Sequence, residues 1–174
     1  EPTNIVVAGS WDCSVTCYEL SRGGGNVVSG IQAQGQIKHE APVMCTAFSA
    51  DPTTCFSGGC DGSVYMWNVT QGSQAAQKIG KHDQPIRCMT FVPEINMLAT
   101  GSWDKSIRLW DCRQPQPAMT IPVSDRVYCM DVKNKTLVAA TGDLQVHAFP
   151  DITNPAGQHS YKSPLSYQSR SINV

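Results

Sequence analysis

Four segments of this chain share one pattern, and their spacing restricts the fold more than any other feature. In each, a small apolar stretch leads to Gly, then to a turn with Asp, then to an alternating stretch that ends in an aromatic residue. The turn aspartates are Asp12, Asp61, Asp104 and Asp143, at spacings of 49, 43 and 39 residues. Repeats of this length with Gly and Trp-Asp pairs are typical of β-propeller blades. The sequence therefore predicts an all-β fold of repeated blades.

Each unit is expected to contribute four strands. The alternation in SVYMWNV and SIRLWDC is typical of strands with two distinct faces, and polar stretches such as SRGGGN (21–26) and TQGSQ (70–74) indicate turns. The four units cover roughly 1–49, 50–92, 93–132 and 133–174. The expected strands lie near 5–10, 14–20, 27–37 and 43–49, then 53–59, 63–69, 74–80 and 86–92, then 97–103, 106–112, 117–123 and 126–132, and finally 136–142, 144–150, 158–163 and 169–174.

Composition excludes several classes of protein. The chain has 174 residues and a formal net charge of −1, which fits one domain with a core and argues against general binding to polyanions. No apolar run is long enough to span a membrane, and no signal peptide is visible. Fourteen Gly and eleven Pro suit a turn-rich β protein better than a helical one.

The eight cysteines do not indicate a metal site. None forms a C-x-x-C pair, so zinc is not expected. Cys45, Cys88 and Cys129 recur in similar apolar contexts, VMCTAF, IRCMTF and VYCMDV, which favours small core residues over a redox or metal role. Scattered thiols without a pairing pattern favour a reducing compartment. We expect no metal and no cofactor.

Two histidines stand at the same distance from two of the turn aspartates. His39 begins HEAPV and His82 begins HDQPI, and each lies 22 residues before its aspartate, Asp61 or Asp104. The equal offsets predict the same role for both histidines in successive units.

The pattern of His, strand, Ser/Thr-Gly, Asp and Trp resembles the WD-repeat propeller family. In that family these side chains form a hydrogen-bond network inside each blade, which implies structural tetrads here. A fourth network is expected to be incomplete, because Asp143 has no preceding His and Phe149 cannot donate. The ATGDLQVHAF turn is expected to be shorter than its counterparts, and His147 has no visible partner. The implied tetrads are His39, Ser57, Asp61 and Trp67, and His82, Thr100, Asp104 and Trp110.

The combination of His, Ser/Thr and Asp is also found in the active sites of hydrolases, but we do not favour that function here. A catalytic set has no reason to recur in register in two units. The chain has no nucleophile elbow, and His39-Glu40 lacks the second His of a zinc protease. The sequence therefore predicts a protein that is not an enzyme.

Longer motifs resemble the Rae/Gle-type mRNA export factor family of the nuclear pore. They are FSGGCDGSVYMW, MLATGSWDKSIRLWDCRQPQP, RVYCMDV and SPLSYQSR. The resemblance implies about four blade-equivalents of a seven-bladed propeller, and hence a piece of a longer protein. It also implies a scaffold that binds a nucleoporin GLEBS-type segment and single-stranded RNA or messenger ribonucleoprotein, in the nucleus and at the nuclear envelope, with cytoplasmic shuttling. The alternative is the related spindle-checkpoint propeller, an adaptor that binds checkpoint kinases through GLEBS-type segments.

In such propellers, the residue before the turn Asp and the residues that open the fourth strand line the binding face. Exposed Trp, Tyr and Arg are favoured anchors at interfaces. Two readings stay open, because Trp11 and Trp103 could instead pack between blades, and the basic bias of 104–135 could be a solvated face. The candidate partner-binding residues are Trp11, Met44, Cys60, Arg87, Trp103, Lys105, Arg108, Arg126 and Tyr128.

Overall fold

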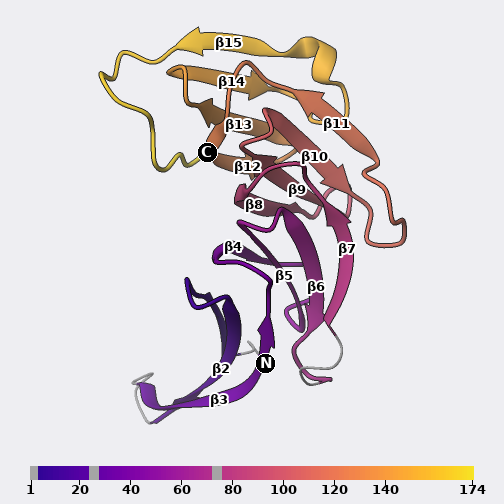
Figure 1. The fold of residues 1–174 in the computed structure, drawn as a ribbon, viewed down its shortest axis with the longest axis vertical. Coiled ribbons are helices and arrows are strands. Elements are labelled where there is room, and N and C mark those ends of the chain that lie inside the picture. The colour runs from indigo at the N-terminus through magenta and orange to yellow at the C-terminus, as the bar shows by residue number, and fades with distance from the viewer. Residues whose placement is uncertain (1–3, 24–27, 72–75) are drawn as a thin grey trace.

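The computed structural model describes residues 4–23, 28–71 and 76–174, and in these residues the fold is all-β. Four antiparallel sheets follow one another along the chain (Figure 1). One short 3₁₀ turn, Pro155–Gly157, precedes the last strand. The sheets comprise β1 (Ile5–Gly9), β2 (Ser14–Arg22) and β3 (Val28–Lys38); β4 (Val43–Phe48), β5 (Thr54–Gly59), β6 (Ser63–Asn68) and β7 (Ala76–Lys81); β8 (Ile86–Val92), β9 (Met97–Ser102), β10 (Ser106–Trp110) and β11 (Met119–Pro122); and β12 (Val127–Lys133), β13 (Thr136–Thr141), β14 (Gln145–Phe149) and β15 (His159–Lys162).

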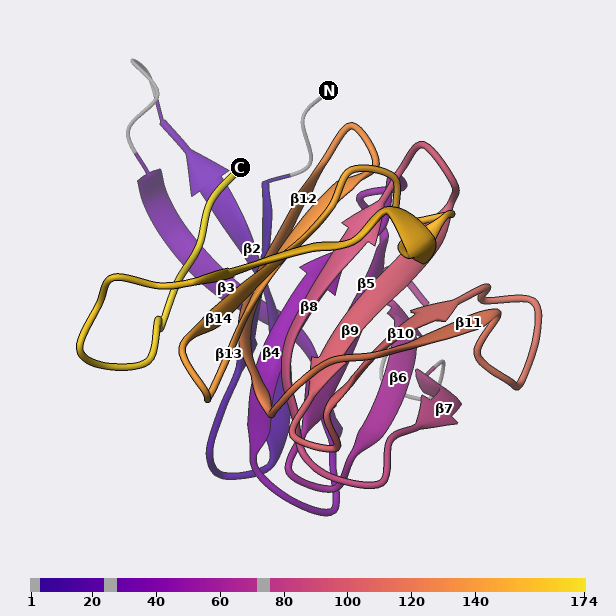
Figure 2. The ribbon, with the colours of Figure 1, turned by 90° about the horizontal axis from the view of Figure 1, so that it is seen from above.

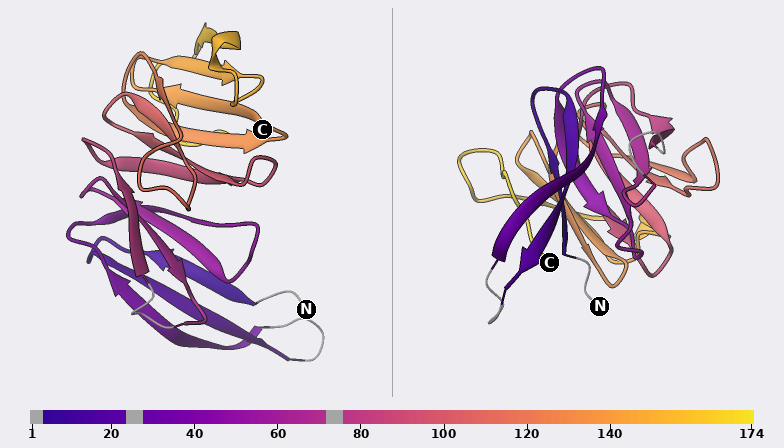
Figure 3. Two further views of the ribbon diagram at one scale, coloured as in Figure 1. Left: turned by 90° about the vertical axis from the view of Figure 1, so that its right-hand side faces the viewer. Right: turned by 90° about the horizontal axis from the view of Figure 1, so that it is seen from below.

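The sheets are stacked in layers along an arc, as in part of a propeller. Figure 1 shows the arc, and Figures 2 and 3 show the layers from above and from the side. The first strands of the last three sheets, β4, β8 and β12, pack side by side in chain order. They form the inner row of the arc.

Each interface between neighbouring sheets buries a separate apolar core. Between the first and second sheets, Trp67 packs with Val15, Cys17 and Cys55. Trp110 occupies the equivalent place in the next core, and Phe149 in the last. Gly80 makes room for Trp110, because a Cβ at this position would run into the indole ring. In the last three sheets, the aromatic side chain of the repeat is therefore buried between neighbouring sheets.

Each strand that the structure describes lies in a segment where the sequence predicted one, but one of the expected strands does not form. Residue 27 and residues 74–75 of the expected strands lie outside the described residues. The expected strand at 169–174 is wrong: this segment forms no ladder and is held instead by scattered bonds to β12. Cys129 Sγ donates to the Ser169 carbonyl, and the Val174 amide donates to Asp131 Oδ2 at 2.8 Å. The last three sheets each begin with the strand that closes the preceding sequence unit, so sheets and units are offset by one strand.

The turns that join the second and third strands of the repeat are all alike. Five residues separate the last paired positions in each hairpin, and the fourth residue of each turn has a positive φ of 64–71°. The expectation of a shorter fourth turn is therefore wrong. Ala139, and not Thr141, takes the place of Thr100, since Ala139 pairs with His147 as Thr100 pairs with Arg108.

No helix in the described part of the chain is long and apolar enough to cross a membrane.

Candidate functional site

The third sheet contains a buried polar network built from four side chains. His82 Nδ1 lies 2.7 Å from Asp104 Oδ2, and His82 Nε2 lies 2.7 Å from Thr100 Oγ1. The Trp110 indole donates to Thr100 Oγ1 at 2.8 Å. His82 and Thr100 are at most 1% exposed, so these polar groups can satisfy their hydrogen bonds only within the protein. The network ties the loop before β8 to the β9–β10 hairpin.

The network favours a neutral His82. Burial lowers the pKa of His82, while the hydrogen bond to Asp104 acts in the opposite direction. The Thr100 hydroxyl can then donate to Nε2, while Nδ1–H donates to Asp104. Burial would raise the pKa of Asp104, but hydrogen bonds from His82 and Ser106 lower it well below its usual range. These hydrogen bonds hold the ionised Asp104 against the neutral His82 inside the protein.

The second sheet repeats the arrangement with one longer contact. His39 Nε2 lies 2.8 Å from Ser57 Oγ, and Trp67 is buried beside them. His39 Nδ1 and Asp61 Oδ2 are 3.4 Å apart, and neither atom has a hydrogen-bond partner among the described residues. An attraction at this distance is weaker than the 2.7 Å pair in the third sheet. The two tetrads therefore differ in strength.

The fourth sheet builds a different network around His147, which sequence reasoning left without a partner. His147 Nε2 lies 2.9 Å from Ser124 Oγ and 3.3 Å from Thr141 Oγ1, and His147 Nδ1 lies 2.8 Å from Ser160 Oγ. His147 is 3% exposed, and burial lowers its pKa. A histidine from the third strand of the sheet thus replaces the loop histidine. The available signal was its place four residues after the turn Asp, where the third unit has Arg108.

The Arg108 side chain links the third sheet to the end of β7 and to the loop that follows it. Its guanidinium donates to the Lys81 carbonyl at 2.8 Å and to Asp83 Oδ2 at 2.9 Å, and lies 3.3 Å from Asp104 Oδ2. The side chain is 17% exposed. Arg108 therefore supports the third network, and a binding surface need not include it.

The hairpin turns and the loops between sheets meet at one edge of the molecule, which we name the turn edge. It consists of turns 10–14, 59–63, 102–106 and 141–145 and loops 39–42, 82–85 and 123–126. The amides of Cys60, Trp103 and Gly142 donate to carbonyls of the adjoining loops at 2.8–3.0 Å. The turn edge therefore has a fixed backbone on which side chains can be presented.

Three candidate residues on the inner strands share a special backbone position. Met44, Arg87 and Tyr128 are each skipped in the strand pairing, because the register shifts between the residues that flank them. A bulge of this kind re-aims a side chain and is often found beside functional sites. The three residues thus form a row along the inner strands, which we call the bulge row.

The two turn tryptophans differ in environment. Trp103 is half-buried: its ring centroid lies 6.1 Å from that of Tyr128, and Arg126 Cζ lies 5.9 Å above it. Trp11 is 76% exposed. Packing between sheets therefore accounts for Trp103, whereas it leaves Trp11 on the surface.

The remaining candidates also lie on the turn edge. Lys105 Nζ forms an ion pair with Asp125 Oδ1 at 3.1 Å, which connects the third hairpin to the loop before β12. Cys60 is half-buried at the turn position that Trp11 and Trp103 occupy in their units. The turn edge therefore offers the exposed indole of Trp11 and the cluster of Trp103 with Arg126 and Tyr128. The bulge row lies beside it on the inner strands.

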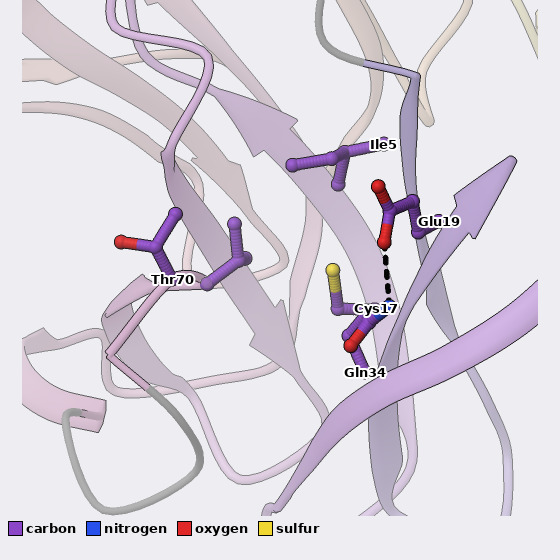
Figure 4. A pocket seen from close by; sticks show the side chains of 6 residues that line it. Ile5, Cys17, Glu19, Gln34 and Thr70 are labelled. Atoms are coloured by element: carbon purple, nitrogen blue, oxygen red, sulfur yellow. Dashed lines mark hydrogen bonds between the residues drawn. The ribbon is translucent and has the colours of Figure 1, made fainter.

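A cavity of about 330 Å³ lies away from the turn edge, between the first two sheets (Figure 4). Ile5, Cys17, Glu19 and Gln34 are among its lining residues, and Gln34 Nε2 donates to Glu19 Oε2 at 2.6 Å. None of the candidate residues lines it. The described residues contain no group of three or more His, Cys, Asp or Glu side chains that could hold a metal ion.

Comparisons with known proteins agree with the repeat. Residues 32–68 and 74–111 match the WD40 family model, described as "WD domain, G-beta repeat". The chain is 48% identical over 170 residues to a protein named RAE1 from Arabidopsis thaliana, and 34% identical over 171 residues to one named Rae1 from Drosophila melanogaster. It is also 34% identical over 173 residues to the mRNA export factor GLE2 of Chaetomium thermophilum.

These matches cover 97–99% of the chain, but only 47–48% of each relative. The chain thus spans about half the length of the curated relatives it matches. Among solved structures, it superposes on the computationally designed Ika8 protein with a TM-score of 0.80 at 15% identity. That match covers the whole chain and 51% of the designed protein, and it supports the fold alone.

Proposed function

We propose, on the premise that this chain is a WD-repeat protein homologous to the Rae1 and Gle2 mRNA export factors, that it acts as an adaptor in nuclear mRNA export. In this proposal the turn edge binds a GLEBS-type segment of a nucleoporin, and the protein works in the nucleus and at the nuclear pore with cytoplasmic shuttling. The observation that carries the proposal is the similarity to proteins named as export factors, which extends over nearly the whole chain.

The turn edge has the composition of an interface. Exposed aromatic and arginine side chains contribute strongly to binding energy at protein–protein contacts. Trp11 is exposed, and Trp103, Arg126 and Tyr128 form one cluster. The backbone beneath them is held by hydrogen bonds between turns and loops. A rigid edge loses little entropy when it binds a partner.

We also propose that the protein is not an enzyme. The His–Thr–Asp sets are enclosed within sheets, with His82 1% exposed and Thr100 not exposed. A general base must come within hydrogen-bond reach of a substrate, and an enclosed histidine cannot do so without local opening. Structural use of these groups explains why they recur.

Binding of single-stranded RNA forms a second part of the proposal. The segment 104–135 has six basic and four acidic residues, including exposed Arg126 and Lys105. Contacts of cations with phosphates would make RNA binding sensitive to salt. We expect such binding to be weak, because Lys105 and Arg108 are already paired with carboxylates.

The test is affinity purification of the full-length protein from its own cells, with and without RNase. Nucleoporins and export factors should copurify, and some partners should be lost after RNase treatment. The Trp11→Ala variant should lose nucleoporins, because it removes the exposed anchor on the turn edge. Tyr161→Ala, which changes another exposed aromatic residue, on the outer strand β15, should not.

Two results would contradict the proposal. Recovery of checkpoint kinases and kinetochore proteins, unaffected by RNase, would favour the checkpoint adaptor. Equal loss of nucleoporins in both variants would place the binding surface away from the turn edge.

A further inference from the structure

Arg87 is the one member of the bulge row that carries a charge. It is half-buried, and no hydrogen bond or ion pair holds its guanidinium in the part of the chain that the structure describes. The other half-buried arginine of this region, Arg108, is held by Asp83, Asp104 and a carbonyl. A partly desolvated cation that lacks a partner carries a cost that a bound anion would relieve.

The position of this cation is defined by the inner strands. Burial raises the pKa of the Cys45, Cys88 and Cys129 thiols, and the positive charge of Arg87 counteracts part of that rise at all three. These cysteines lie on β4, β8 and β12. Arg87 therefore acts where the three inner strands come together, between the bulge residues Met44 and Tyr128.

The repeat explains why Arg87 is left uncovered. A Cβ at Gly9, Gly58 or Gly101 would touch Val43, Ile86 or Val127, which are the first residues of β4, β8 and β12. Each interface thus brings a turn residue, two positions after the glycine, toward the bulge residue of the next sheet.

Two of these interfaces have a tryptophan in the turn, and the middle one does not. At the last interface, the Trp103 ring lies beside that of Tyr128, with 6.1 Å between the centroids and an angle of 47° between the planes. At the interface that carries Arg87, the turn residue is Cys60, which is too small to cover a guanidinium. At this interface the turn therefore places a thiol, and not an indole, toward the charge.

We infer that Arg87 binds a carboxylate of an extended protein segment, whose flanking apolar side chains rest on Met44 and Tyr128. This inference rests on the proposed function, because the segment is the nucleoporin segment that the turn edge is proposed to capture. Arginine suits this role, because its planar guanidinium donates two parallel hydrogen bonds to a carboxylate. The flanking side chains provide apolar contact on either side of the charge.

The charges of the turn edge favour a peptide over RNA at this site. Lys105 is paired with Asp125, and Arg126 lies over Trp103. Single-stranded nucleic acid is held by a track of cations along its phosphates together with stacked bases. Arg87 is a single unpaired cation between Met44 and Tyr128 among the described residues. Such a site suits a peptide with one acidic residue between apolar residues.

The test measures binding of the GLEBS-type nucleoporin segment to the full-length protein by calorimetry. Arg87→Gln should raise Kd by roughly tenfold, the effect of losing one charge-assisted contact. The acidic residues of the segment are replaced one at a time by their amides, and one replacement should weaken binding to the wild type but add little in Arg87→Gln. Arg113→Gln is the matched control, because Arg113 is exposed and pairs with Asp111 outside the turn edge.

A second variant tests the role of the small turn residue Cys60 without removing the charge. Cys60→Trp should restore the indole found in the neighbouring turns and weaken the segment's binding. Melting temperatures close to that of the wild type would show that the variants fold.

The outcomes separate the two proposals. If the segment fails to bind the wild type, the proposed function falls, and this inference falls with it. If the segment binds and Arg87→Gln has the affinity of the wild type, only the inference is overturned. If Arg87→Gln weakens binding of oligouridine but not of the segment, the anion is a phosphate and the assignment of a carboxylate is wrong.

Discussion

At the scale of single residues, the two tetrads show that the same residue types produce unequal contacts. The His–Asp distance is 2.7 Å in the third sheet and 3.4 Å in the second. A buried hydrogen bond depends steeply on such differences, and leaving one partner unsatisfied costs more than the bond itself contributes. The third network should therefore contribute more to stability.

Asp104→Asn should lower the free energy of unfolding by about 1–3 kcal/mol, because it weakens the hydrogen bond to His82 and removes a charge-assisted contact. Asp61→Asn should have a smaller effect, because its contact with His39 is longer. Urea titrations of the two variants provide the measurement. Equal midpoints would contradict the inequality of the two networks.

The buried histidines predict a dependence of stability on pH. Burial lowers the pKa of His39, His82 and His147 from their ordinary value of 6.5. Below pH 6.5 the unfolded chain binds protons that the folded chain does not, so their contribution is full above pH 6.5 and is lost as the pH falls.

Urea midpoints should therefore decrease from pH 7.5 to pH 5.5. A His147→Asn variant should show a weaker decrease, whereas His159→Gln, which changes an exposed histidine, should follow the wild type. A flat profile in the wild type would contradict neutral burial of the three histidines.

At the scale of elements, the strands were predictable and the bulges were not. Alternation is a local property, so the sequence located the strands of all four sheets. The segment 169–174 alternates as well, but a strand also requires a ladder partner, which sequence pattern does not reveal. The bulges at Met44, Arg87 and Tyr128 carry no sequence signal that we recognise, although they decide which side chains leave the ladder.

Of the candidate site, the equal offsets predicted that His39 and His82 have the same role, and the family resemblance implied the side chains around them. The unequal His–Asp distances could not be predicted, because they depend on packing around each pair. The network around His147 could not be predicted in this way. Thr141-Gly142 looks like Thr100-Gly101, but Ala139 is the residue that corresponds to Thr100, so an alignment on the Thr-Gly pair is wrong by two residues. Counting from the turn Asp would have corrected it. Short motifs align well only when their constant turn length is known.

The close approach of the Trp110 indole to Gly80 leads to a prediction about the interface between the second and third sheets. Gly80→Ala should destabilise the protein by about 1–3 kcal/mol, because the new methyl group would run into the buried indole. Gly157→Ala is the matched control, because nothing lies within 4 Å of a Cβ there. Thermal unfolding should distinguish them, and equal melting temperatures would show that the interface adjusts freely.

At the scale of the whole molecule, each sheet packs against the next one along the chain. One face of the first sheet has no neighbouring sheet against it among the described residues. Val6 is 43% exposed and Ile31 66% exposed, and together with Tyr18 and Leu20 they line an apolar surface. Tyr18 has the aromatic position that Trp67 and Trp110 fill as buried wedges. The face is equivalent to those that neighbouring sheets cover, in accord with our proposal that the chain is part of a larger propeller.

The 174-residue chain alone should therefore self-associate as its concentration rises, since exposed contiguous apolar surface promotes association. Ile31→Lys should reduce that association, whereas Gln32→Lys, on the neighbouring residue of the same strand, should do so less. Light scattering over a range of concentrations is the measurement. A monodisperse wild-type monomer would contradict the prediction.

The bulge row has a consequence for how such a scaffold could change its partner. Met44, Arg87 and Tyr128 are skipped in the strand pairing, so their side chains are not fixed by the alternation that the cores require. Each can be exchanged with little penalty to the ladder. The same fold could thus acquire a new binding specificity through substitutions at these three positions, while the rest of each repeat keeps the residues that the fold requires.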